Sequence, residues 1–262
     1  MADTGDPRIE LVFDGMAAII TLARPEKLNA LDYEMFIALE RAAHAIELNE
    51  NIRAAIITGQ SDKSFCAGGD IEAWATRSPR QFGQAWVRHG HRAFDALARL
   101  RQPLIAALNG HILGGGLELA ATADFRIAEE HIKVGQPEAG LGIIPGWSGT
   151  QRAVRRFGSQ IVRRMSLLGE TYGAAEAMQH GLVDKIVPRG ESLAEALRWT
   201  EVICSRGPAA LELIKALINA AEGEEQERPL EAAAGAFAAA TGDLREGIQA
   251  FREKRKPKFD GK

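Results

Sequence analysis

One pattern recurs along the chain up to about residue 190: an apolar strand-like segment ends in a glycine-containing loop, and a helix-like segment follows. Residues 53–58 (RAAIIT) form one such strand pattern and lead into Gly59. Residues 103–108 form another and lead into the glycine run 114–116. Strand, loop and helix repeats of this kind predict an α/β fold with a βαβ-type sheet, whose ligands bind at the loops.

Other elements are predicted at the start of the chain. Residues 8–13 and 16–22 are strand-like runs on either side of Asp14-Gly15, a pair that favours a type I′ hairpin turn. Asp32 can cap a helix over residues 33–48, where apolar residues recur at helical spacing. A long helix is expected over residues 79–100.

The character of the sequence changes from about Glu191 onward, where strand signals stop and helical periodicity takes over. Ser192 is the predicted cap of the first of these helices. Pro208 and Pro229 are placed as first-turn prolines, so the remainder divides into about four helices. We therefore expect a core over residues 1–190 that holds the site, and a helical segment over residues 191–262.

Composition excludes several function classes. The 262 residues are 46% hydrophobic and 26% charged, as in an ordinary soluble globular protein, and the net charge of −3 argues against a general nucleic-acid binder. No apolar run reaches the ~18 residues of a membrane span, and residues 1–14 lack the apolar core of a signal peptide. Cys66 and Cys204 are too few for a disulfide framework or a four-ligand zinc site. We expect a cytoplasmic protein without a metal site or a membrane partner.

Residues 114–118 (GGGLE) are the stretch that carries most chemistry, together with Gln136-Pro137-Glu138. Glycine lets the main chain approach a ligand closely, and amides in the first turn of the helix expected over residues 117–123 lack intrahelical partners. Gly115 and Glu118 are three residues apart, so on a helix both face the same way. An amide donor and a carboxylate would then point into one pocket, whereas a tight turn is the alternative interpretation of the glycines.

A second glycine loop, residues 65–70 (FCAGGD), follows a predicted strand. It is a candidate for another inward-facing amide. Two amides aimed at one carbonyl oxygen form an oxyanion hole, which contributes roughly 10²- to 10³-fold per donor in acyl chemistry.

The chain resembles the crotonase superfamily, the enoyl-CoA hydratase/isomerase proteins, from about Glu10 to Phe259. The resemblance rests on several motifs in order: residues 24–31 (RPEKLNAL), 65–70, 109–118, 135–138 (GQPE), 142–146 (GIIPG) and 149–152 (GTQR), extended by Ala174, Ala177 and residues 181–183.

What the resemblance implies is a crotonase-like spiral of ββα units and a thioester carbonyl bound by the N–H groups of Gly69 and Gly115. It implies hydration of trans-2-enoyl-CoA to 3-hydroxyacyl-CoA in fatty-acid or related acyl-CoA catabolism, without a metal or redox cofactor, because coenzyme A is part of the substrate. Glu118 is assigned mainly to water activation and Glu138 mainly to proton delivery. The C-terminal helices would mediate assembly into homotrimers or homohexamers.

The resemblance also implies contacts with coenzyme A. Arg24 and Lys27 would approach its phosphates, and the alternative is a surface pair. The backbone carbonyl of Cys66 or Ala67 could contact the adenine, although Cys66 is also a small packing residue. The basic segment that ends at Phe259 could reach a phosphate of coenzyme A. The alternatives are that its charges are simply solvated, or that it contacts a nucleic acid, for which only these few residues speak. Further substrate contacts are expected at Asp70, Ile71, Trp74, Gly146 and Trp147.

Two tryptophans depart from the family pattern. Trp147 follows Pro145-Gly146 where many family hydratases have a small residue, and Trp74 lies just beyond the first oxyanion loop. Both could narrow the acyl pocket, and Trp147 could equally be a buried packing residue. The rival functions are a double-bond isomerase, a specialised dehydratase for a carnitine-like or branched acyl-CoA, and a non-catalytic acyl-CoA- or RNA-binding protein of the same fold.

Overall fold

The computed structural model describes residues 2–262, with Pro229 described by its backbone alone. The chain divides into one compact unit that ends at Glu212 and another from Leu213 to Lys262. This division differs from the boundary expected after residue 190. The reason is that α9 (Ser192–Cys204) packs on strands of the larger sheet and so belongs to the first unit.

The larger sheet of the first unit has six strands in the order β1-β2-β3-β5-β7-β10. The first two strands are antiparallel, and each following pair is parallel. The predicted α/β class is therefore confirmed, and the strands expected over residues 53–58 and 103–108 are found within one residue. The six strands span Ile9–Asp14 (β1), Ala17–Leu22 (β2), Ala54–Gly59 (β3), Leu104–Leu108 (β5), Phe125–Glu129 (β7) and Lys185–Val187 (β10).

The N-terminal hairpin forms as predicted, but its turn type is different. Asp14 pairs with Ala17, so Gly15 and Met16 are the two loop residues. Only Gly15 has a positive φ, +57°. A type I′ turn needs positive φ at both positions, whereas a type II′ turn needs it only at the first, so the type I′ prediction is wrong.

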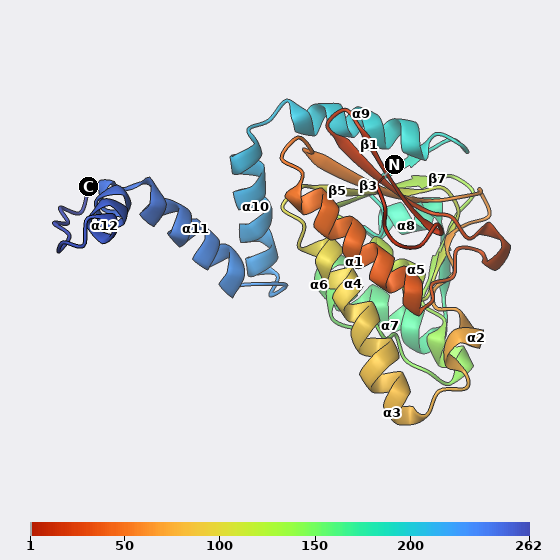
Figure 1. Ribbon diagram of the computed structural model, residues 1–262. Helices are drawn as coiled ribbons and strands as arrows, with labels where there is room; N and C mark the ends of the chain where they lie inside the picture. The colour runs from red at the N-terminus through yellow and green to blue at the C-terminus, as the bar shows by residue number, and fades with distance from the viewer. Residues whose placement is uncertain (1) are drawn as a thin grey trace. The chain divides into compact units, whose positions relative to one another are not determined.

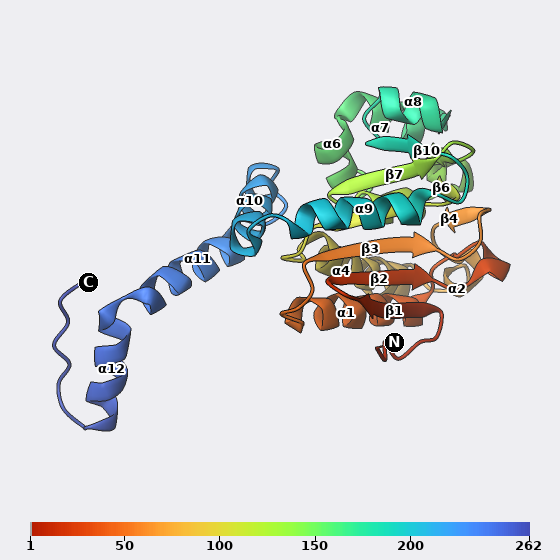
Figure 2. The ribbon, with the colours of Figure 1, turned by 90° about the horizontal axis from the view of Figure 1, so that it is seen from above.

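The two faces of the larger sheet contribute to different cores, because side chains alternate along a strand. Ala55 and Ile57 of β3 belong to the main core, which contains buried residues of α1 (Tyr33–Leu48) and α4 (Arg88–Ala98). Ile56, between them, belongs to a smaller core with Ala196 of α9. Helices α1 and α4 lie alongside each other on one face (Figure 1), and α9 crosses the other (Figure 2).

The smaller sheet has four strands in the order β4-β6-β8-β9. Its first three strands are parallel and short: Ser64–Cys66 (β4), His111–Leu113 (β6) and Lys133–Gly135 (β8). The fourth, β9 (Thr171–Gly173), runs antiparallel to β8.

The helix predictions are partly confirmed. Helix α1 begins after Asp32, whose side chain accepts a hydrogen bond from the Met35 N–H, as a capping residue should. The helix expected over residues 79–100 is present as α3 (Pro79–Gln81), a π-helical segment Phe82–Val87 and α4. The prediction that Ser192 caps α9 is wrong. Ser192 is the first helical residue, and its hydroxyl group donates a hydrogen bond to Glu129 instead.

Four helices follow residue 190 in the described chain, as expected: α9, α10 (Pro208–Ala221), α11 (Glu227–Ala240) and α12 (Gly242–Arg252). Pro208 is the first residue of α10, and Pro229 lies in the first turn of α11. The remaining helices are short. They are the 3₁₀ segments Pro25–Lys27 and Glu138–Leu141, α2 (Ile71–Trp74), α5 (Gly115–Ala120), α6 (Arg152–Phe157), α7 (Ser159–Leu168) and α8 (Ala174–Gln179).

The start of α5 packs directly on the end of β4. A Cβ at Gly116 would overlap the backbone carbonyl oxygen of Cys66. Both partners are main chain, so neither can move away as a flexible side chain would. The strand and the helix can approach this closely only with glycine at position 116.

We predict that Gly116→Ala destabilises the first unit by about 1–3 kcal/mol, because the added methyl group forces β4 and α5 apart. Urea unfolding measures the change. Gly83→Ala is the matched control, since a Cβ at Gly83 meets no atom within 4 Å and its helical φ suits alanine. The control should be neutral or stabilising, and equal destabilisation by the two variants would contradict the close contact at Gly116.

Candidate active site

Three segments that were singled out in the sequence follow three neighbouring parallel strands. Gly69 comes after β4, Gly115 after β6 and Glu138 after β8. The carboxyl ends of adjacent parallel strands lead their loops to the same edge of a sheet, where α/β proteins bind ligands. The Gly114 N–H donates to the Gly135 carbonyl over 2.9 Å and ties two of these loops together. Topology thus brings the three segments into one site.

The two predicted oxyanion amides line one cavity. The loops that carry them touch, since a Cβ at Gly68 would lie 2.9 Å from the Gly115 nitrogen. Within the described chain, neither the Gly69 N–H nor the Gly115 N–H donates to another residue. Gly115 is also the first residue of α5, where the helix dipole favours negative charge. Two unused donors are available for a carbonyl oxygen in the cavity.

Glu118 extends from α5 into the same cavity and is 2% exposed. Its Oε1 accepts hydrogen bonds from the backbone N–H groups of Trp147 and Gly149, each 2.6 Å long. Ser148 between them has a positive φ of +78°, and Gly149 leaves room, since a Cβ there would lie 2.7 Å from Oε1. Because Oε1 takes both bonds, Oε2 is the oxygen left for a water molecule.

Glu138 lines the cavity from the 3₁₀ segment after β8 and is 8% exposed. Both of its carboxyl oxygens are buried and make no hydrogen bond in the described chain. Glycine at position 114 lets the carboxyl group come close, because a Cβ there would lie 3.0 Å from Oε1. A buried carboxyl group without donors favours its protonated form.

The two glutamates share an electrostatic environment that allows one charge more easily than two. Burial and the nearby Glu138 carboxylate together raise the pKa of Glu118 to about 8, although hydrogen bonds from the backbone N–H groups of Trp147 and Gly149 lower it in part. Burial raises the pKa of Glu138 to about 7. The pair therefore holds about one proton near neutral pH. The pKa of Glu118 is the higher of the two, but we place the charge on Glu118 on the ground of geometry, because its Oε1 accepts two N–H hydrogen bonds and the Glu138 carboxyl group accepts none from another residue.

The cavity wall is mostly apolar, and four of its residues lie outside both the motifs quoted from the sequence and the predicted contacts: Phe82, Trp86, Val87 and Leu141. Of the predicted contacts, Ala67, Ile71, Trp74, Gly146 and Trp147 line it. The additional wall residues, all within the quoted motifs, are Gly68, Leu113, Gly114, Pro137, Ile143 and Ile144. Phe82 and Trp86 are four residues apart on the π-helical segment, so the helical spacing of these two aromatic residues was the signal available in the sequence.

Comparison with known proteins agrees with this arrangement. Residues 14–262 match the family model described as Enoyl-CoA hydratase/isomerase. The chain belongs to this family. Its curated relatives include crotonyl-CoA hydratase of Syntrophomonas wolfei, which is 38% identical and aligns over 94% of this chain and 95% of its own length. Short-chain-enoyl-CoA hydratase of Clostridium acetobutylicum is 37% identical and aligns over 93% of this chain and 94% of its own length.

Solved structures of similar proteins have the same architecture. An enoyl-CoA hydratase from Bacillus anthracis aligns with a TM-score of 0.80 at 34% identity, covering 97% of this chain and 100% of that one. Pseudomonas aeruginosa DspI aligns with a TM-score of 0.81 at 33% identity, covering 97% of each chain. The predicted crotonase-like fold is thereby confirmed for this member of the enoyl-CoA hydratase/isomerase family.

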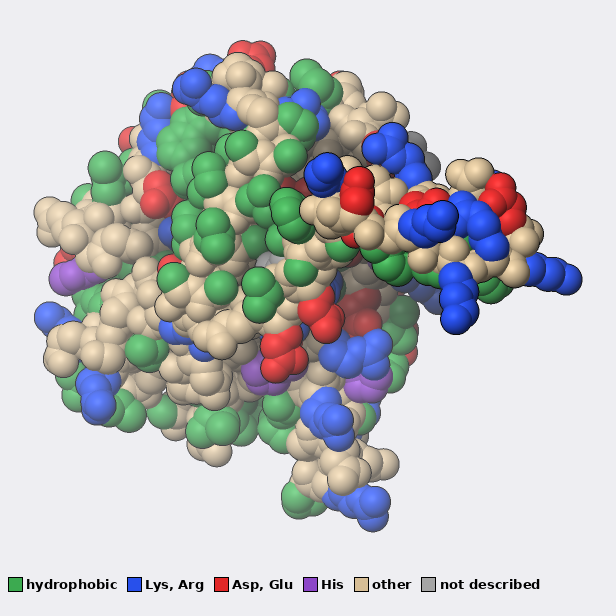
Figure 3. Space-filling view, turned by 90° about the vertical axis from the view of Figure 1, so that its left-hand side faces the viewer, with side chains coloured by type: hydrophobic (Ala, Val, Ile, Leu, Met, Phe, Trp, Pro, Cys, Tyr) green, Lys and Arg blue, Asp and Glu red, His purple; other side chains and the backbone are tan. Residues whose placement is uncertain are grey.

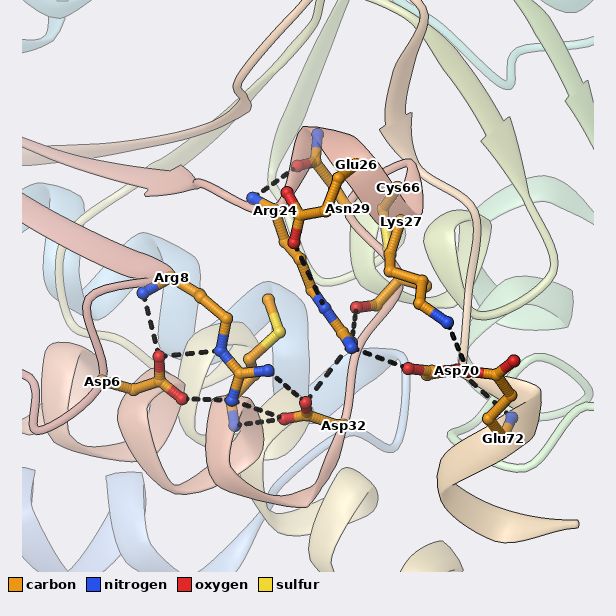
Figure 4. Close-up of polar contacts among 12 residues, drawn as sticks. Asp6, Arg8, Arg24, Glu26, Lys27, Asn29, Asp32, Cys66, Asp70 and Glu72 are labelled. Atoms are coloured by element: carbon orange, nitrogen blue, oxygen red, sulfur yellow. Dashed lines mark hydrogen bonds and ion pairs between the residues drawn. The ribbon is translucent and has the colours of Figure 1, made fainter.

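In this family member the guanidinium of Arg24 is held within the protein. It donates to Asp70 Oδ2 over 2.8 Å and to the Ala30 carbonyl over 3.0 Å, and it lies 3.3 Å from Asp32. Arg8 links Asp32 in turn to Asp6 (Figure 4). Arg24 and Asp70 are thus partners of each other and do not line the cavity, and their contact with coenzyme A stays a prediction.

The remaining predicted contacts also lie outside the cavity lining. Lys27 pairs with Glu72 at the surface. Cys66 is fully buried at the end of β4, where burial raises the pKa of its thiol to about 12. Phe259 belongs to the second unit and is 61% exposed. No group of three or more His, Cys, Asp or Glu within residues 2–262 is arranged to hold a metal ion.

We predict that Glu138→Gln stabilises the protein in alkaline solution. Burial raises the pKa of Glu138 from 4.5 to about 7, so wild-type stability falls as the pH rises between these values. Glutamine carries no charge there, and the variant should be more stable by about 1–3 kcal/mol above pH ~8 and equal to wild type below pH ~4.5.

Denaturant unfolding at both pH values measures this difference. Glu50→Gln is the matched control, because Glu50 is exposed and its loss should change stability little at either pH. A Glu138→Gln variant that is less stable than wild type above pH ~8 would contradict the assigned burial of charge.

Proposed function

We propose that this family member catalyses the reversible addition of water to a trans-2-enoyl-CoA, which gives a 3-hydroxyacyl-CoA. The observation that carries the proposal is the meeting of two unused backbone amides with two buried glutamates in one apolar cavity. Similarity to proteins named crotonyl-CoA hydratase and short-chain-enoyl-CoA hydratase supports it. The activity fits the breakdown of fatty acids and related acyl-CoA thioesters.

The first task of the site is to hold the thioester carbonyl. Its oxygen would accept hydrogen bonds from the Gly69 and Gly115 N–H groups. Conjugation carries electron density from C3 toward this oxygen as water adds, so the oxygen gains charge that the two donors stabilise. The apolar wall keeps bulk water away and strengthens these interactions.

The second task is to move two protons. Glu118 accepts a hydrogen bond from water at its Oε2 and takes one proton as the water oxygen bonds to C3. The electron pair of the double bond passes to C2 and the carbonyl, and Glu138 delivers its proton to C2. Water has then been added across the double bond, Glu118 is neutral and Glu138 is charged. Proton exchange between the pair or with solvent restores the starting state.

These steps need no group beyond the chain and its substrate, so we propose a hydratase without a metal or redox cofactor. Coenzyme A enters as part of the thioester, with Arg24, Lys27 and Phe259 as proposed contacts. Every helix in the described chain is too short or too polar to cross a membrane. A cytoplasmic location stays a prediction.

We also propose assembly into homotrimers or homohexamers through the second unit. Its helices carry exposed large apolar side chains: Leu213, Ile214, Leu217, Ile218, Leu230, Phe237, Leu244, Ile248 and Phe251. Figure 3 shows apolar side chains exposed among charged ones on the face that it presents. Contact with other copies of the chain would remove such side chains from water.

We predict that Glu118→Gln and Glu138→Gln each lower kcat for hydration of crotonyl-CoA by about 10²- to 10⁴-fold, since each removes one proton-transfer group. The loss of absorbance of the conjugated thioester measures the rate. Binding of butanoyl-CoA should persist in both variants, because neither change removes an oxyanion amide.

Parental rates in both variants would overturn the catalytic assignment. Activity on 3-enoyl-CoA together with no hydration of crotonyl-CoA would favour the isomerase alternative. Binding of acyl-CoA without turnover of either thioester by the wild-type protein would favour a non-catalytic role.

We further predict a bell-shaped dependence of kcat/KM on pH with its maximum between about 7 and 8, the pKa values of the pair. At lower pH both glutamates are protonated and no base remains, whereas at higher pH both are charged and no acid remains. Hydration rates of crotonyl-CoA measured from pH ~5 to ~10 test this. A flat profile over that range would contradict the shared proton.

A further inference from the structure

The indole of Trp147 lies directly behind the oxyanion amides. A Cβ at Gly115 would overlap the six-membered ring, and a Cβ at Gly69 would lie 3.0 Å from its Cη2. Trp147 lines the cavity and yet is only 4% exposed. It is therefore both a pocket residue and a packing residue, the two roles that the sequence left open.

Other aromatic side chains pack around this indole. Its ring centroid lies 4.9 Å from that of Phe36, 5.4 Å from Trp86 and 5.3 Å from Phe94. Phe36 and Phe94 are fully buried and do not line the cavity. The indole thus separates the cavity from the buried rings of Phe36 and Phe94.

Helix α4 makes room for the indole at a single position. A Cβ at Gly90 would overlap Nε1 of Trp147 and lie 2.5 Å from its Cδ1. Gly90 has no positive φ that would require glycine. Close packing of the indole is the constraint at this position, and a larger residue there would push the ring toward the cavity.

The exposed part of the cavity wall is at the opposite end. Ile71, Leu141 and Ile144 line the cavity and are exposed, whereas Trp86 and Trp147 are buried. Coenzyme A is too large for the closed end and must lie toward the exposed residues. With the carbonyl on the two amides, the acyl chain points away from the sulfur and toward the indoles.

The space available to that chain is small. The cavity has a volume of about 190 Å³, and an apolar cavity of ~150 Å³ is filled by one benzene molecule. A rigid indole packed at interior density cannot shift by the length of several methylene groups without disrupting its neighbours.

We propose that Trp147, accommodated by Gly90, closes the acyl end of the cavity and restricts the enzyme to short-chain 2-enoyl-CoA thioesters. The inference rests on the proposed hydratase function and adds the class of acyl group. Trp147 is here a specificity-determining residue. Its side chain can be changed while its backbone N–H continues to donate to Glu118.

The experiment compares kcat/KM for crotonyl-CoA and trans-2-decenoyl-CoA. The wild-type protein should favour the shorter thioester by about tenfold or more. Trp147→Ala opens an aromatic-lined space behind the amides and should lower this ratio by about tenfold or more. Trp147→Leu keeps an apolar side chain in the core and should shift the ratio in the same direction by a smaller factor, if the alanine variant does not fold.

Two further variants complete the design. Phe94→Leu is the matched control: it disturbs the same aromatic cluster but does not line the cavity, so it should keep the wild-type ratio. Gly90→Ala moves the indole toward the substrate and should raise the KM for crotonyl-CoA. Circular dichroism verifies that each variant is folded.

A wild-type protein that hydrates both thioesters equally, or Trp147 variants that keep the wild-type ratio, would overturn the proposal. Binding of butanoyl-CoA and decanoyl-CoA, measured by calorimetry, gives a readout that does not depend on catalysis. If the folded wild-type protein hydrates neither thioester, the hydratase function is wrong. The chain-length dependence of binding in the wild type and in Trp147→Ala then still decides the role of Trp147.

Discussion

The candidate active site depends on direct contact between two backbone segments, with no side chain between them. The end of β4 touches the first turn of α5, and Gly68 lies against the Gly115 nitrogen. Parallel pairing of β4 with β6 delivers both loops to one edge of the smaller sheet. Two N–H groups remain unused there because no side chain or neighbouring strand reaches them. The close contact thus fixes where a carbonyl oxygen can bind, and the glutamates are arranged around that point.

The same close packing raises the pKa values of the two glutamates. Water excluded from the cavity would otherwise solvate two carboxylates, and its absence raises both pKa values toward the working pH. The protein compensates one charge with the N–H groups of Trp147 and Gly149 and leaves the other glutamate without donors. Reactivity is therefore obtained at the expense of stability, as is common where a buried group must be ready to exchange a proton.

Local rules predicted the parts of this structure that local interactions determine. Asp32 caps α1 because a cap involves only the next three residues. Continuous apolar runs identified β3 and β5, and apolar residues at helical spacing identified α1. Local rules were wrong where a distant partner decides. The Ser192 hydroxyl group donates a hydrogen bond to Glu129, which is far away in the sequence, so Ser192 does not cap the helix. The family motifs identified both glycine loops and both glutamates, but not the aromatic wall, since Phe82 and Trp86 were visible only as apolar positions of a long helix.

Arg24 illustrates how the surroundings change the interpretation of a motif. The family resemblance implies that Arg24 contacts a phosphate, yet its side chain is 11% exposed and its guanidinium is held between Asp32 and Asp70. Asp70 directly follows Gly69, the proposed oxyanion residue. The backbone is hydrogen-bonded to Leu31 on both sides of Gly69, because the Gly68 carbonyl accepts from the Leu31 N–H and the Asp70 N–H donates to the Leu31 carbonyl. The ion pairs therefore hold the segment that fixes the direction of the Gly69 N–H. The motif therefore acts on the proposed oxyanion hole through the backbone.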